Sequence, residues 1–383
     1  MKIHGANASS QPAFLPMASP QACALADTDV PLRAASLDQP FVIGSVDTPS
    51  GKVPQVSPLL TGRDRWGSIK ARWGVSRMDY AIDPGLYALG SPDEGSPVLV
   101  TANYKMTFDR LREALPGRNL WILVLDTDGI NVWCAAGKGT FGTGELVRRI
   151  KASGLADCVR HRDLILPQLG APGVSAHLVR KISGFKVHYG PILARDIPAY
   201  LDAGMKATPG MRRKTFTLQE RSVLIPIELV AAMKPAAVII PTLLVISALG
   251  GKGTFLQNLI HDGIFSLAAF LLAIVSGAIL SPILLPYLPG RAFATKGFSV
   301  GFAVAILFLF AWGVDPHSWR EMLLGGAWLL MIPALSAFLA MNFTGASTYT
   351  SLSGVKREMR WALPMEIGVG IAGFAVLLVS RLF

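Results

Sequence analysis

The sequence predicts an α/β, Rossmann-like domain with a parallel sheet, followed by an all-α transmembrane domain of five helices. Two observations lead to this fold class. Short apolar runs alternate with helix-like segments between residues 98 and 203, and five long apolar segments follow residue 221. The alternation is typical of a parallel sheet covered by helices. Apolar segments close to twenty residues long are typical of helices that cross a bilayer.

The 383 residues divide into four parts. Residues 1–55 are rich in Ala, Ser, Pro and Gln, lack periodicity and are expected to be mobile. Residues 56–205 carry the strand–helix pattern, residues 206–221 form a basic hinge, and residues 222–383 form the membrane domain. The candidate strands are Val98–Thr101, Leu120–Asp126, Leu164–Leu166 and Phe185–His188, and the helix-like segments lie near Thr107–Leu115, Thr143–Ser153, Val174–Lys181 and Ile197–Ala203.

Composition also indicates a membrane protein. Hydrophobic residues make up 51% of the chain, and the mean hydropathy of +0.44 is too high for a soluble protein. The net charge of +11 is therefore assigned to cytoplasmic faces rather than to nucleic-acid binding.

The apolar segments that are candidate spans lie near residues 235–250, 263–288, 297–314, 322–341 and 363–380. Loops 289–296 and 342–362 carry more Lys and Arg than the other two loops, so they belong on the cytoplasmic side. The protein is therefore expected to be a multi-pass inner-membrane protein. Its amino-terminal domain would lie in the cytoplasm, and its carboxyl end would lie on the opposite side of the membrane. Because Glu366 is the one charged residue within these five segments, an anchor is favoured over a transporter.

The segment Asn131–Lys138 is the main candidate for a metal-binding or catalytic site. It follows the apolar run Leu120–Leu125 and a polar turn, so it lies just beyond the carboxyl end of a strand. Asn131 is placed as an N-cap and Gly137 as the end of a very short helix, with Cys134 in the first turn. A thiolate is favoured there and suits a soft metal or nucleophilic chemistry. The alternative is that Cys134 is a small buried hydrophobe.

Polar or glycine residues also follow the other candidate strands. They are Asn103, Tyr104, Thr127, Gln168, Tyr189 and Gly190. Because ligands of parallel sheets bind beyond the carboxyl ends of the strands, these residues and Cys134 are expected to form one pocket. The alternative for each residue, taken singly, is an ordinary structural role in a loop.

The octapeptide at residues 131–138, Asn-Val-Trp-Cys-Ala-Ala-Gly-Lys, resembles the cap-helix signature of the corrinoid protein of microbial mercury methylation. Other segments similar to that family are Arg63–Gly67, Arg72–Gly74, Pro84–Tyr87, Val100–Lys105, Leu166–Leu169, Val187–Pro191 and Phe343–Ser351. The likeness is close over roughly residues 56–205 and looser in the hydrophobic remainder. The same domain is also similar to the corrinoid iron–sulfur protein of the acetyl-CoA pathway.

The resemblance implies a corrinoid such as cobalamin, bound base-off, with the Cys134 thiolate as the lower axial ligand of cobalt. The implied cofactor contacts are the strand-end residues above together with Asn131, Trp133, Ala135, Gly137 and Lys138. The implied activity is that of a mercury methyltransferase, which moves a methyl group derived from methyltetrahydrofolate from cobalt to Hg(II) and forms methylmercury. An electron-rich thiolate opposite the Co–C bond suits a soft electrophile.

The cysteines imply a separate reductant. Cys23, Cys134 and Cys158 are too few for an iron–sulfur cluster in this chain and are too widely spaced for a disulfide framework. In the family it resembles, the electrons come from a small ferredoxin-like protein with two 4Fe–4S clusters. Two alternatives remain: a membrane-anchored corrinoid methyl carrier for another acceptor, and a membrane transporter or receptor with a ligand-binding cytoplasmic domain.

Overall fold

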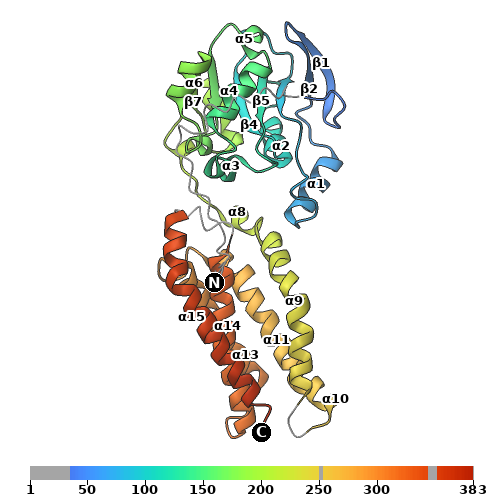
Figure 1. Cartoon of the computed structure of the whole chain (residues 1–383), viewed down its shortest axis with the longest axis vertical. Coiled ribbons are helices and arrows are strands. Elements are labelled where there is room, and N and C mark those ends of the chain that lie inside the picture. Colours follow the sequence, from blue (N-terminus) through green and yellow to red (C-terminus); the bar gives the residue numbers. More distant parts are fainter. Residues whose placement is uncertain (1–34, 250–252, 344–351, 383) are drawn as a thin grey trace, which may run out of the picture. The chain divides into compact units, whose positions relative to one another are not determined.

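The structure is a computed structural model that describes residues 35–249, 253–343 and 352–382. The chain separates into two compact units (Figure 1). The α/β unit contains the described residues up to 68 and residues 78–213, and the helical unit contains residues 69–77 and the described residues from 214 onward. The division after Arg213 lies within the segment expected to be a basic hinge.

The α/β unit is built on a seven-stranded mixed sheet in the order β1-β2-β3-β5-β4-β6-β7. The strands are β1 (Val42–Thr48), β2 (Gly51–Val56), β3 (Gly85–Leu89), β4 (Val98–Ala102), β5 (Leu120–Leu125), β6 (Asp163–Leu166) and β7 (Lys186–Tyr189). The four strands expected from the sequence are β4 to β7, and they are parallel to one another. The expectation of a wholly parallel sheet is wrong, because β1 and β2 pair antiparallel, as do β3 and β5.

The β1–β2 hairpin corrects the expectation that residues 1–55 are mobile throughout. Residues 42–56 form the edge of the sheet, and Phe41 is buried in the core beside Val56. Most of β1 is exposed, so it has no apolar run by which the sequence could reveal it. The first described core residue is Ala35 rather than a residue near Val56.

Helices cover both faces of the sheet (Figure 1). They are α2 (Lys105–Glu113), α3 (Val132–Lys138), α4 (Thr143–Ala152), α5 (Leu155–Cys158), α6 (Ala176–Ser183) and α7 (Ile197–Asp202), with short 3₁₀ turns η1 (Gln168–Gly170), η2 (Ala194–Asp196) and η3 (Gly210–Arg212). A further helix, α1 (Gly62–Arg72), begins in this unit, and its residues from Ile69 onward belong to the helical unit. The helices expected near residues 107, 143, 174 and 197 correspond to α2, α4, α6 and α7.

Alternate residues of the central strands enter two separate cores. Val100 of β4 packs on one face with Leu146 of α4, and Leu99 packs on the other face with Phe108 of α2 and Tyr200 of α7. Strands that are buried on both faces carry continuous apolar runs. This burial explains why β4 and β5 could be predicted from the sequence.

The strand order creates a switch point between β4 and β6. From β4 the chain passes through α2 to β5 on one side, and it later returns to β6 on the other side of β4. Because α2 and α4 then lie on opposite faces of the sheet, a crevice opens at the carboxyl ends of β4 and β6. A ligand of this fold is expected in that crevice.

A buried ion network joins α1 to α2. The ammonium Nζ of Lys105 lies 2.7 Å from Asp64 Oδ1 and 2.6 Å from Asp109 Oδ1. The guanidinium of Arg112 reaches both carboxylates, at 3.0 Å and 2.8 Å, and it donates to the carbonyls of Ser57 and Leu59. Burial alone raises the pKa of Asp64, but hydrogen bonds from Lys105 and Thr61 outweigh it and hold that pKa well below its usual value.

This lowered pKa predicts a loss of stability in acid. The unfolded chain binds the proton at about pH 4, whereas the folded unit resists it, so the free energy of unfolding falls as pH drops below about 4. We expect Asp64→Asn to weaken the unit at neutral pH and to flatten this dependence. The test is to measure the free energy of unfolding between about pH 6 and pH 3. If this free energy depended on pH as steeply in Asp64→Asn as in the parent protein, the role of Asp64 would be contradicted.

The helical unit contains five helices long and apolar enough to cross a membrane, as expected from the sequence: Leu218–Ala248, Phe255–Leu284, Phe293–Trp312, Trp319–Met341 and Arg357–Val379. Its elements are α8 (Leu218–Ser222), α9 (Ile225–Ala248), α10 (Phe255–Asn258), the π-helical turn η4 (Leu259–Gly263), α11 (Ile264–Ile274), the π-helical turn η5 (Val275–Leu280), α12 (Ser281–Leu284), α13 (Phe293–Trp312), α14 (Trp319–Met341) and α15 (Leu352–Val379). The first span begins at Leu218, well before the residue 235 expected from the sequence.

Close packing of α13 on α14 depends on small residues. A Cβ atom at Gly297 would lie 2.6 Å from the carbonyl oxygen of Ser336, and one at Gly301 would lie 2.6 Å from the Cβ of Ser336. The Ser336 hydroxyl donates to the Gly297 carbonyl at 2.7 Å. Small residues at such contacts are typical of helices packed in membranes.

Candidate functional site

The short helix α3 holds Cys134 as the sequence predicted. Asn131 is the N-cap, and its side-chain oxygen accepts a hydrogen bond from the Cys134 amide at 3.0 Å. The left-handed residues Asp128 and Gly129 turn the chain from β5 into this cap. The helix does not end at Gly137 but runs to Lys138, and it stops at Gly139, whose φ of 89° is accessible without strain only to glycine.

The two faces of α3 differ in burial. Val132, Ala135 and Ala136 pack into the core, whereas Cys134, Gly137 and Lys138 are exposed. The interpretation of Cys134 as a buried hydrophobe is therefore wrong. Ala135 is fully buried and belongs to the core on this face of the sheet, and its role as a cofactor contact stays a prediction.

The other described cysteine provides a contrast. Cys158 is buried at the end of α5. Burial raises the pKa of its thiol, which disfavours the reactive thiolate. Cys23 lies outside the described residues.

A cavity of about 270 Å³ occupies the switch point beside α3. Thr101 of β4 and Leu166 of β6 form part of its wall, at the carboxyl ends of their strands. Asn131 and Trp133 line it from α3, and Gly190 lines it just after β7. These are the positions where the crevice of such a sheet receives its ligand.

Asn103 and Thr127 brace the turn before α3. The Asn103 side-chain oxygen accepts hydrogen bonds from the backbone amides of Thr127 and Gly129, both at 3.1 Å. It also lies 2.8 Å from the Thr127 hydroxyl, and its amide nitrogen donates to Asp126. Since both residues are buried, they shape the turn and do not face the cavity.

The remaining strand-end residues have diverse surroundings. Tyr104 is the buried N-cap residue of α2. The Gln168 side-chain oxygen accepts a hydrogen bond from Arg212. The Tyr189 hydroxyl donates to the Val174 carbonyl at 2.6 Å, and burial raises its pKa.

The structure therefore brings together only part of the expected pocket. Asn131, Trp133 and Gly190 line the cavity, and Cys134, Gly137 and Lys138 form the exposed face of the adjoining helix. Four residues that were not predicted as site residues also line the cavity: Thr101, Leu166, Ile192 and Ile197. The first two lie in the family-like segments Val100–Lys105 and Leu166–Leu169, but nothing there distinguished them from other strand residues. The last two follow β7 as apolar residues without a polar side chain to mark them.

Residues 75–201, which include this site, match the family described as CO dehydrogenase/acetyl-CoA synthase delta subunit. The chain is also similar to proteins named acetyl-CoA decarbonylase/synthase complex subunit gamma. Identity is 39% over 97 residues with that of Methanocaldococcus jannaschii, covering 25% of this chain and 20% of the relative. It is 34% over 150 residues with that of Methanothermobacter thermautotrophicus, covering 39% and 31%. It is 36% over 129 residues with that of Methanopyrus kandleri, covering 33% and 27%.

The match thus spans less than a third of the length of each of these relatives. The family match at residues 75–201 lies almost wholly in the α/β unit of this chain.

Proposed function

We propose that this chain is a membrane-anchored, corrinoid-dependent methyltransferase that passes a methyl group to Hg(II). The observation that carries the proposal is the exposed thiol of Cys134, held by the Asn131 cap on a short helix beside the switch-point cavity. The similarity to subunits of acetyl-CoA decarbonylase/synthase supports methyl transfer in general. The choice of Hg(II) rests on the octapeptide at residues 131–138.

The residues present fit a corrinoid. A flat macrocycle needs an open surface from which one axial donor projects, and the exposed face of α3 offers a thiol flanked by Gly137, where an added Cβ atom would meet nothing within 4 Å. Thiolate sulfur is a strong donor to soft metals. When bound, the corrinoid supplies the cobalt that carries the methyl group.

The chain's own residues would hold and tune that group. Cys134 would be the lower axial ligand, with the bound cobalamin base-off. Asn131 fixes the first turn of α3 and therefore the direction of the sulfur. Asn103 fixes the turn before it, so it is a positioning residue. Trp133 and Gly190 line the cavity and would contact the periphery of the cofactor. Lys138 is exposed and would contact the polar groups of the cofactor.

A methyl carrier with another acceptor is the second candidate, and the similarity to the gamma subunits favours it. In either case the methyl group would derive from methyltetrahydrofolate. A separate ferredoxin-like protein with two 4Fe–4S clusters would be the reductant, because the three cysteines of the sequence are fewer than the four that one cluster requires.

Two measurements test the proposal. The chain, purified in detergent and mixed with cobalamin, is expected to retain a corrinoid absorption spectrum after gel filtration. Absence of any corrinoid binding would contradict the proposal and favour a transporter or receptor. A deletion strain complemented with this gene and its ferredoxin-like partner is expected to form methylmercury. Corrinoid binding without formation of methylmercury would favour a methyl carrier whose acceptor is not Hg(II).

We further propose that the helical unit is an inner-membrane anchor with the α/β unit in the cytoplasm. Reporter fusions are expected to place Lys296 inside, and Lys252 and the carboxyl end outside. Lys252 and most of the family-like segment Phe343–Ser351 lie outside the described residues. The basis is the distribution of Lys and Arg among the loops. A cytoplasmic carboxyl end would mean that one of the five helices does not cross.

Removing the cap should loosen α3 without removing the donor. Asn131→Ala is expected to destabilise the helix by about 1 kcal/mol and to lower methylmercury formation only in part. Hydrogen exchange of the Cys134 amide is expected to rise, because that amide loses its acceptor. Asn131→Asp keeps a cap oxygen and should preserve protection. Equal exchange in Asn131→Ala and the parent protein would contradict the role of the cap.

A further inference from the structure

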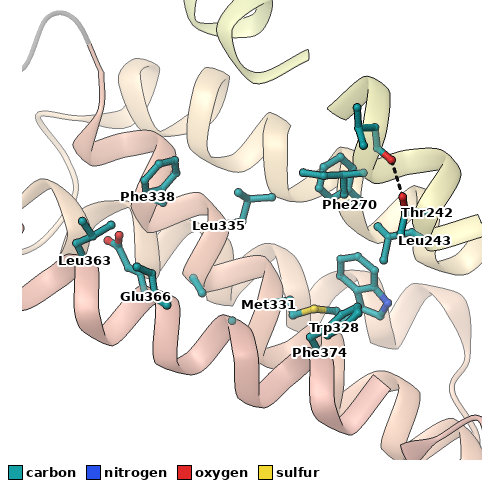
Figure 2. A pocket seen from close by; sticks show the side chains of 15 residues that line it. Thr242, Leu243, Phe270, Trp328, Met331, Leu335, Phe338, Leu363, Glu366 and Phe374 are labelled. Carbon is teal, nitrogen blue, oxygen red and sulfur yellow. Dashed lines mark hydrogen bonds between the residues drawn. The ribbon is translucent and has the colours of Figure 1, made fainter. Parts of the chain in front are cut away.

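A second cavity, of about 530 Å³, lies wholly within the helical unit, among α9, α11, α14 and α15. Its volume is in the range of small-molecule binding sites. Most of its wall is apolar, and aromatic rings recur in it: Phe270, Trp328, Phe338 and Phe374. Figure 2 shows these side chains around the space between the helices.

The cavity is lined by one acidic side chain, that of Glu366. Neither carboxylate oxygen of Glu366 has a hydrogen-bond partner among the described residues, although both oxygens are buried. Glu366 lies nine residues after Arg357, where the last membrane-compatible helix begins, which is about 14 Å along a helix. An ionisable group at such depth is costly to charge without a partner, and it indicates a functional site.

Several other charged groups of this unit are engaged elsewhere. Arg320 and Arg381 both pair with Asp262, and Lys296 donates to the Leu285 carbonyl at 2.8 Å. Glu358 accepts a hydrogen bond from the Ala294 amide at 2.7 Å. In the part of the chain that the structure describes, no ion pair reaches Glu366.

Glu366 lies toward one end of the cavity, and aromatic rings lie at both ends. Figure 2 shows Glu366 beside Leu363 and Phe338 at one end, and Trp328 with Phe374 and Met331 toward the other. A carboxylate attracts a cation, and aromatic faces attract cations further while also accepting apolar bodies. A ligand that enters from the bilayer must itself be lipophilic.

We propose that this cavity binds a lipophilic organic monocation, with its charge at Glu366 and its apolar body along the aromatic wall. This site is separate from the Cys134 site and does not depend on the chemistry proposed there. Charge complementarity selects a cation over a neutral lipid tail, which would leave the carboxylate without a partner.

Two ions of the same shape and opposite charge test the proposal. The chain is reconstituted in nanodiscs and titrated with tetraphenylphosphonium or tetraphenylborate. Saturable binding of tetraphenylphosphonium with one site per chain is expected, and tetraphenylborate, titrated into a separate sample, should show no saturable site. Equal binding of both ions would overturn the proposal, because the cavity would then accept any apolar solute. The absence of a saturable site for either ion would overturn it too.

Variants localise the site. Glu366→Gln is expected to weaken tetraphenylphosphonium binding by about tenfold or more, and a smaller loss would overturn the role of its charge. Gly370→Leu adds a side chain to the cavity wall and should block binding. Gly368→Leu is the matched control, because Gly368 lies on the same helix, does not line the cavity and has open space around its Cα. Similar binding by the two leucine variants would place the site elsewhere.

Discussion

Replacing Cys134 with Ala is expected to abolish methylmercury formation while leaving the fold intact. Alanine is a good helix former, and the Cys134 side chain is exposed, so the change removes a donor and little packing. The backbone amide that Asn131 caps is retained. Methylmercury is measured in the complemented deletion strain, and circular dichroism of the purified protein checks the fold.

Two further variants make this result specific. Cys134→His keeps a ligand but offers a neutral nitrogen in place of a thiolate, so methyl transfer to Hg(II) should be severely reduced or absent. Cys158→Ala is the cysteine control and should retain activity, since Cys158 is buried away from the exposed face of α3. Methylation by Cys134→Ala at the parent rate would refute the thiolate mechanism.

The second large effect is expected on stability. Arg112→Met should lower the free energy of unfolding of the α/β unit by about 3–5 kcal/mol. The Arg112 side chain has no exposed surface, and its loss leaves Asp64 and Asp109 with Lys105 as their one remaining cation in the network. The carbonyls of Ser57 and Leu59 also lose their donor. Denaturant unfolding followed by circular dichroism measures the change.

The same helix supplies the control. Arg110 pairs with Glu113 on the surface, with 57% and 40% of the two side chains exposed. Exposed pairs contribute roughly 0–1 kcal/mol, so Arg110→Met should have little effect. Equal destabilisation by the two substitutions would show that burial of the network is not what makes Arg112 important.

Local signals in the sequence predicted the part of the fold that surrounds the site. Continuous apolar runs marked β4 and β5, because both are buried on two faces. The cap at Asn131 involves residues three positions apart, so it could be predicted without knowledge of the tertiary structure. Hydropathy likewise predicted the number of membrane-compatible helices.

Long-range packing decided the rest. Asp64 and Lys105 are 41 residues apart in the chain, so no local pattern in the sequence predicts their contact. Asn103 follows a strand as a ligand-binding residue would, yet its side chain turns inward to the next loop. Position at a strand end therefore places a residue at the correct edge of the sheet but does not determine whether its side chain faces the cavity.

We propose that the Cys134 sulfur binds the cobalt of a corrinoid. Cobalt-edge X-ray absorption of the chain loaded with cobalamin tests it directly. We expect one sulfur in the first coordination shell of cobalt in the parent protein and in Cys158→Ala, and none in Cys134→Ala. A first shell of nitrogen and oxygen alone in the parent protein, or sulfur retained in Cys134→Ala, would contradict the claim.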